Sequence, residues 1–90
     1  MNKYIQIPIK DTYFSQILIG RKKEEYREIN YHWSKELQKE PTHILFVCGR
    51  KNMLVEYLGY EIKEIKHEFF NNKPTKVFAI KLGNIIQSNI

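Results

Sequence analysis

The sequence predicts an α+β domain, mainly β, in which a small and strongly curved sheet or barrel of about five strands carries two short helices. The N-terminal segment alternates apolar and polar residues, as a strand with one buried face does. Two segments with the spacing of amphipathic helices follow early in the chain. The second half contains apolar strands separated by polar turns, and the longest of them changes its alternation at a glycine.

The first strand is expected over Tyr4 to Ile9, where three alternate isoleucines share one face. A helix is expected over Asp11 to Ile19, because apolar residues at positions 14, 17 and 18 recur on one helical face. The Asp11 carboxylate is expected to cap this helix by accepting free N–H groups of the first turn. Gly20 is expected to end it in a left-handed conformation.

A second strand is expected over Lys23 to Ile29, with Glu25 and Arg27 on one side and Tyr26 on the other. Asn30 is expected to cap a second helix that continues to about Lys39. In this helix Trp33 and Leu37 lie one turn apart and form the buried stripe, and Pro41 closes the segment.

The remaining strands are expected at Thr42 to Cys48, Met53 to Lys66 and Thr75 to Leu82, joined by polar turns at 49–52 and 71–74. The first of these is a continuous apolar run, which suits a strand covered on both faces. The parity of the second changes across Gly59, which indicates a β-bulge or a barrel corner.

Composition limits the classes of function. Ninety residues form one domain, 1–90, and the net charge of +5 favours a polyanionic partner such as nucleic acid. No apolar stretch approaches the roughly 20 residues of a membrane span, and the single Cys48 excludes an internal disulfide, so a cytoplasmic protein is expected. The three histidines and Cys48 lack ligand spacing, so neither a metal site nor a cofactor is expected.

The segment directly behind Gly20 concentrates charge around Tyr26 and is the first candidate site. The Arg27 guanidinium suits bidentate acceptors such as a phosphate or a base edge, and Glu25 is placed to orient it or to accept from a base amine. Lys22 suits a phosphate contact, and Tyr26 suits stacking on a base. The alternative is a structural ion pair between Glu25 and Arg27 with Lys22 in solvent.

A second candidate is the turn that contains Arg50 and Lys51, because two cations beside a central strand can hold a nucleic-acid backbone. An ordinary polar hairpin turn is the alternative at this position.

Gly20, Lys22, Glu25 and Arg27 reproduce the pattern G-x-K-x-x-E-x-R, and a helix with aromatic and aliphatic residues precedes them while a Trp-containing helix follows. In these features the chain resembles ASCH domains of the PUA-like superfamily, especially the short ASCH proteins of low-GC bacteria and their phages. The resemblance implies a pseudo-barrel of five to six strands with a cleft beside the motif that receives RNA, a nucleotide or a nucleoside.

Some relatives of this kind are amidohydrolases that deacylate modified cytidine, and ribonuclease activity has been claimed for others. In the amidohydrolases the motif lysine acts with a threonine, and Glu25 stands at the position of that threonine here. We therefore expect RNA, nucleotide or nucleoside binding through Lys22, Glu25, Tyr26 and Arg27, with Arg50 and Lys51 as secondary contacts. The alternative is a hydrolase of modified nucleosides or RNA, with Lys22 and Glu25 as catalytic residues. An interaction module that uses the fold as a scaffold is a third class.

Overall fold

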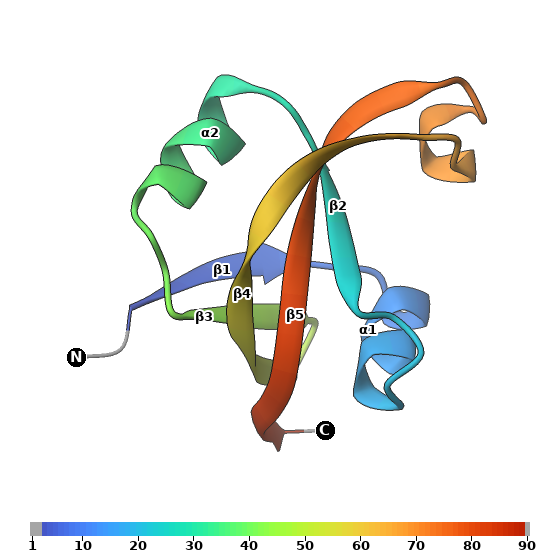
Figure 1. Cartoon of the computed structure of the whole chain (residues 1–90). Coiled ribbons are helices and arrows are strands. Elements are labelled where there is room, and N and C mark those ends of the chain that lie inside the picture. Colours follow the sequence, from blue (N-terminus) through green and yellow to red (C-terminus); the bar gives the residue numbers. More distant parts are fainter. Residues whose placement is uncertain (1–2, 90) are drawn as a thin grey trace.

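Five strands form one mixed sheet in the order β1–β3–β4–β5–β2 (Figure 1). The computed structural model describes residues 3–89, apart from the side chain of Phe69. In chain order the elements are β1 (Tyr4–Pro8), α1 (Asp11–Leu18), β2 (Glu24–Glu28), α2 (Tyr31–Gln38), β3 (His43–Cys48), β4 (Lys51–Ile65), the 3-10 turn η1 (Glu68–Phe70) and β5 (Thr75–Asn89).

The sheet is curved but open. β1 pairs in parallel with β3, and the other three pairings are antiparallel. Within residues 3–89 no strand pairing joins β1 to β2, so these two strands are the edges. The predicted class, α+β and mainly β, is thus confirmed, whereas closure into a pseudo-barrel is not.

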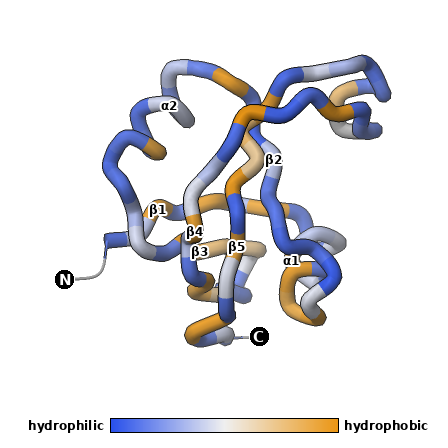
Figure 2. Tube along the Cα trace, in the orientation of Figure 1, coloured by the Kyte–Doolittle hydropathy of each residue, from blue (hydrophilic) through white to orange (hydrophobic). Residues whose placement is uncertain are grey.

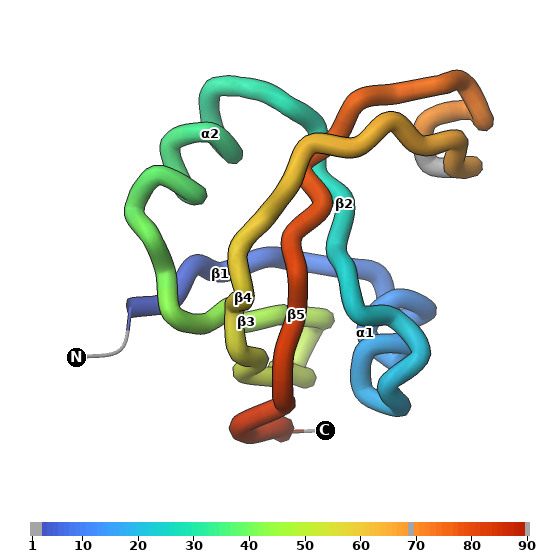
Figure 3. Tube along the Cα trace, in the orientation of Figure 1, coloured from blue at the N-terminus to red at the C-terminus, as the bar shows by residue number. Residues whose placement is uncertain are grey.

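β4 and β5 are the longest elements, with 15 residues each, and they pair along most of their length. Their register shifts three times, the last time between Tyr57 and Tyr60, where Gly59 has φ +108°. The predicted irregularity at Gly59 is therefore confirmed. Beyond Gly59 the two strands stay paired as far as Ile65 and Thr75, and this part, the β4–β5 arm, ends in η1 (Figure 3).

The ends of the two helices differ in how their free N–H groups are satisfied. The side chain of Asn30 accepts a hydrogen bond from the Trp33 N–H at 2.9 Å, so the predicted cap of α2 is confirmed. The predicted cap of α1 by Asp11 is wrong. Lys10 stands at the N-cap and its side chain makes no capping hydrogen bond to the helix, while Asp11 lies inside the helix, where its carboxylate pairs with Lys51.

The core lies where α1 and α2 cover the sheet, and Figure 2 shows apolar residues along β1, β3 and the adjoining parts of β4 and β5. Ile44 and Phe46 of β3 are fully buried and alternate with half-buried neighbours. Leu37 is buried and Trp33 is half-buried at the edge of this core. The fully buried large side chains are Phe14, Phe46, Ile7, Ile44, Met53, Ile80, Val55 and Val77.

The last strand is longer than predicted. It begins at Thr75 as expected but continues beyond Leu82 to Asn89, and its final residues pair with the start of β4. The Glu56 carboxylate accepts a hydrogen bond from the backbone N–H of Asn84 at 2.9 Å, which supports the strand just beyond its predicted end.

Candidate functional site

A cavity of about 470 Å³ lies beside the edge strands, between the end of β1, the first turn of α1, β2 and η1. Drug-sized and nucleoside-sized ligands occupy pockets of roughly 300–1,000 Å³, so this one has room for a nucleobase with its sugar. Its lining residues are Pro8, Ile9, Lys10, Tyr13, Lys22, Glu25, Tyr26, Arg27, Glu28, His67 and Phe70.

Glu25 is the buried charged residue of the core region, with 5% of its surface exposed. Its Oε2 accepts hydrogen bonds from Arg27 Nη2 at 2.6 Å and from Arg27 Nε at 3.1 Å. Its Oε1 lies 3.4 Å from Lys22 Nζ. A buried carboxylate requires such partners, because the interior solvates charge poorly. The three predicted residues are thus brought together in one wall of the cavity.

The purely structural alternative requires Lys22 to point into solvent, and in the structure it does not. Its side chain is 14% exposed, and its Nζ lies 4.8 Å from the ring centroid of Tyr26 and 5.4 Å from that of Tyr13. Aromatic faces attract an ammonium ion at these distances. Lys22 is therefore a positioned cation inside the cavity.

Arg27 connects the two edges of the sheet. Its Nη2 donates to the Pro8 carbonyl of β1 at 2.9 Å as well as to Glu25, and its Cζ lies 5.2 Å from the ring centroid of Trp33 in α2. Packing on Trp33 and bonding to two acceptors fix the plane of the guanidinium. The structural alternative predicted an ion pair between Arg27 and Glu25, and this pair is present. Both residues also line the cavity.

The local sequence explains how Lys22 reaches this position. α1 ends at Leu18, and Gly20, with φ +80°, turns the chain back. The backbone N–H groups of Arg21 and Lys22 then both donate to the Gln16 carbonyl, at 2.9 and 3.1 Å. β2 begins two residues later, so the motif lysine lies at a tightly bonded junction between helix and strand.

Aromatic side chains form a further part of the cavity lining. The rings of Tyr13 and His67 lie 5.8 Å apart at 52°, which joins α1 to the end of the β4–β5 arm. Burial raises the pKa of Tyr13, with help from Glu68 and Glu25. Burial and the hydrogen bond to Glu24 raise the pKa of Tyr26. Both phenols therefore keep their protons at neutral pH, and Tyr26 donates a hydrogen bond to Glu24 Oε1 at 3.1 Å.

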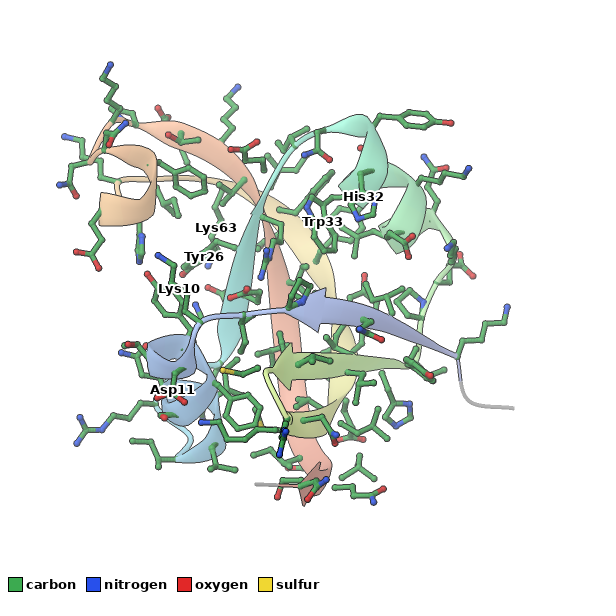
Figure 4. The ribbon with its side chains drawn as sticks, turned by 180° about the vertical axis from the view of Figure 1, so that it is seen from behind. Lys10, Asp11, Tyr26, His32, Trp33 and Lys63 are labelled. Atoms are coloured by element: carbon green, nitrogen blue, oxygen red, sulfur yellow. The ribbon has the colours of Figure 1, made fainter. Side chains whose placement is uncertain are left out.

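Sequence reasoning missed several of the lining residues, including Lys10, Tyr13, His67 and Phe70. Tyr13 precedes the buried Phe14, and its place in the aromatic-rich helix before the motif was an available signal. His67 and Phe70 carry no such signal, because their position depends on how the β4–β5 arm folds back toward α1. Figure 4 shows Lys10, Tyr26 and Lys63 on the side of β2 that lies between α1 and the end of this arm.

The structure does not bring Arg50 and Lys51 to the cavity. Both lie at the turn between β3 and β4, and neither lines the cavity. Lys51 pairs with Asp11, and its Nζ lies 5.2 Å from the ring centroid of Phe14. The hydrogen bond to Asp11 raises the pKa of Lys51. This turn therefore secures the start of α1.

Among residues 3–89 there is no group of three or more His, Cys, Asp or Glu side chains that could hold a metal ion. No helix in the same range is long and apolar enough to cross a membrane. Comparison of the chain with protein-family models, curated proteins and solved structures finds no match.

The cavity combines three cations, two carboxylates, two phenols, an imidazole and a phenyl ring. Both oxygens of Glu25 are already engaged by cations, so the unused donors of Lys22 and Arg27 determine what binds. This arrangement suits a flat aromatic ligand that carries carbonyl or phosphate oxygens.

Proposed function

We propose that this chain is an RNA-, nucleotide- or nucleoside-binding module that holds one base in the cavity beside Lys22, Glu25 and Arg27. The observation that carries the proposal is the convergence of these three side chains with two tyrosines in a cavity of about 470 Å³. An ion pair that served the fold alone would not need an aromatic wall and a positioned lysine beside an open volume.

In this proposal the rings of Tyr13 and Tyr26 contact the face of the base, since stacking on exposed aromatic residues contributes about 1–3 kcal/mol per base. Lys22 and Arg27 donate hydrogen bonds to a base carbonyl or to a neighbouring phosphate. Glu25 keeps both cations in place and retains acceptor capacity for an exocyclic amine, because a carboxylate offers about four lone-pair sites.

The resemblance to ASCH domains of the PUA-like superfamily belongs to the same proposal, together with a cytoplasmic location. It is supported by the fact that Lys22, Glu25 and Arg27 of the motif, which the resemblance implies to lie beside a cleft, line one cavity. An open five-stranded sheet with a side-chain bridge between its edges is compatible with a pseudo-barrel, and the Arg27 bond to Pro8 supplies that bridge.

Thermal denaturation in the presence of nucleosides, nucleoside 5′-monophosphates and short RNAs tests the proposal. A ligand present at 100 times its Kd adds about 2.7 kcal/mol to the free energy of unfolding. In a domain of this size each kcal/mol raises Tm by about 4–8 °C. We expect at least one of these ligands to raise Tm in a saturable way, by the shift that these two figures give together. If none of them raises Tm, the proposal is rejected.

A hydrolase of modified nucleosides is the second candidate, because Lys22 Nζ lies 3.4 Å from Glu25 and Glu28 adds a further carboxylate to the lining. In such an enzyme Lys22 and Glu25 are the catalytic residues. However, contacts with a carboxylate and two ring faces hold the Lys22 ammonium in a position from which it can donate hydrogen bonds to a ligand, as the binding proposal requires. Mass spectrometry of acylated cytidines and short RNAs incubated with the protein decides between the two, with Lys22→Ala as the inactive control for an enzyme.

A further inference from the structure

A second hollow, of about 580 Å³, lies next to the cavity. The two share the lining residues Tyr13, Lys22, Tyr26 and His67, so they adjoin one another. The residues that line the second hollow are Tyr13, Gln16, Arg21, Lys22, Lys23, Glu24, Tyr26, Leu58, His67, Lys81 and Leu82.

The second hollow is much more basic than the first. Its lining contains the four cations Arg21, Lys22, Lys23 and Lys81 against the single carboxylate of Glu24. By comparison, the first cavity contains three cations and two carboxylates. A concave surface that is lined mainly by positive charges attracts polyanions and raises their local concentration.

The cations of the second hollow differ in how far they are engaged. Arg21 and Lys23 are exposed, and within the described part of the chain their side chains make no hydrogen bond or ion pair. Lys81 lies 3.7 Å from Glu61 on the surface, which is a weak contact. Glu24 is occupied instead by Lys63, which donates to both of its oxygens at 2.9 Å. The unpaired positive charge therefore comes chiefly from Arg21 and Lys23.

The two hollows meet along β2. Glu25 and Arg27 line only the first cavity, whereas Glu24 lines only the second. The Tyr26 ring belongs to both, with Lys22 Nζ 4.8 Å from its centroid. The exposed side chain of Leu58 adds an apolar contact to the second hollow, suited to a sugar or a second base.

We infer that the second hollow binds the phosphate and the adjoining nucleotide of a single-stranded RNA whose base occupies the first cavity. The ligand class is then an RNA chain rather than a free nucleoside. This inference rests on the proposed function, since it assumes a base in the first cavity. Lys22 is the common contact, because it lines both hollows and can donate to a phosphate that passes between them.

The test compares two ligands in two variants. A labelled single-stranded ten-nucleotide RNA of mixed sequence is titrated by fluorescence anisotropy, and cytidine, uridine, adenosine and guanosine are titrated by calorimetry. The site variant is Arg21→Gln with Lys23→Gln. The matched control is Lys35→Gln in the last turn of α2 with Lys39→Gln at its C-cap, which removes the same charge from exposed lysines that line neither hollow.

We expect the wild type to bind the RNA at least tenfold more tightly than any nucleoside. The site variant should lose about tenfold in RNA affinity, and its slope of log Kd against log salt should fall by about 1.4, which corresponds to two lost phosphate contacts on a single strand. Its affinity for the best nucleoside should not change, and the control variant should keep both affinities within twofold.

Two results would overturn the inference and they have different meanings. If a nucleoside binds but the RNA binds no more tightly, or if the control loses as much RNA affinity as the site variant, the proposed function stands and the phosphate site is rejected. If neither the RNA nor any nucleoside binds the wild type, the proposed function fails together with the inference.

Discussion

Arg27 of β2 donates a hydrogen bond to the carbonyl of Pro8 in β1 at 2.9 Å, and this side chain bridges the two edges of the sheet. The same nitrogen contacts Glu25 at 2.6 Å, so the bridge and the buried carboxylate share one donor. The residue proposed to bind ligand therefore also holds together the edges beside the cavity.

The first prediction concerns this bridge. In Arg27→Ala the Pro8 carbonyl and Glu25 both lose a donor, and we expect the free energy of unfolding to fall by about 2–3 kcal/mol. Hydrogen exchange at the Ile9 N–H, which bonds to Val47 O at 3.0 Å, should accelerate as the end of β1 loosens. Arg27→Lys serves as the comparison, because a single ammonium cannot reproduce the planar fork. Equal protection of Ile9 in both variants and the wild type would show that the bridge is dispensable.

The second prediction concerns the buried carboxylate. Glu25→Ala leaves Lys22 and Arg27 facing each other without a counter-charge, and we expect a loss of about 2–4 kcal/mol in urea denaturation, since both cations keep some access to solvent. Glu28→Gln, an exposed carboxylate of the same strand, should change stability by less than about 0.5 kcal/mol. A Glu25→Ala protein as stable as Glu28→Gln would contradict the view that this carboxylate holds the two cations in place.

The third prediction concerns the helix stop before the motif. Gly20 has φ +80°, and an added Cβ meets open space, so any cost of substitution comes from the backbone. We expect Gly20→Ala to destabilise the protein by about 1–2 kcal/mol, and Gly20→Asn to cost less because Asn tolerates left-handed geometry. Thermal denaturation measures both. If alanine were no worse than asparagine, backbone strain would not be the reason for glycine at this position.

The fourth prediction concerns pH. The hydrogen bonds from Lys63 chiefly, and also that from Tyr26, lower the pKa of Glu24 below its ordinary value of 4.5. A lowered folded pKa means that the unfolded chain binds the proton more readily, so this contribution to stability is complete above pH 4.5 and is lost as the pH falls. The difference in Tm between the wild type and Glu24→Gln should therefore shrink below that pH.

Lys63, the partner of Glu24 in this ion pair, limits the contribution of the pair to stability at high pH. The hydrogen bond to Glu24, with that to Glu61, raises the pKa of Lys63 above 10.5, so its contribution is complete below that pH and is lost as the pH rises further. The Tm difference between wild type and Glu24→Gln should stay constant at intermediate pH. A difference that does not change at either extreme would mean that the Glu24–Lys63 pair adds nothing to stability.

Local signals accounted for much of the fold. The cap at Asn30 and the stop at Gly20 depend on residues within one turn, and the structure has both. The cap expected from Asp11 failed because Lys51, 40 residues away, takes its carboxylate. The extension of β5 was missed for the same reason, since Glu56 supports the N–H of Asn84 from another strand. Partners distant in sequence cannot be inferred from local patterns.

In the candidate site, too, residues close in sequence were predictable and residues distant in sequence were not. Lys22, Glu25 and Arg27 lie within six residues at a junction of helix and strand. Their spacing alone also allowed an ion pair between Glu25 and Arg27 with Lys22 in solvent, and it was the resemblance to a known family that favoured a shared cleft. The other side of the cavity, with His67 and Phe70, depends on the path of the β4–β5 arm and was not predictable. The secondary cations Arg50 and Lys51 were judged by charge alone, and charge does not determine on which side of α1 a turn lies.

The most direct test of the account is a nuclear magnetic resonance titration of the ¹⁵N-labelled protein with the four ribonucleoside 5′-monophosphates. We expect at least one of them to shift the amide signals of Tyr13, Lys22 and Tyr26 in a saturable way, while those on the outer face of α2, such as Lys35, stay unchanged. Signals that do not move with any of the four, or that move only outside the cavity lining, would contradict a base-binding site beside Glu25.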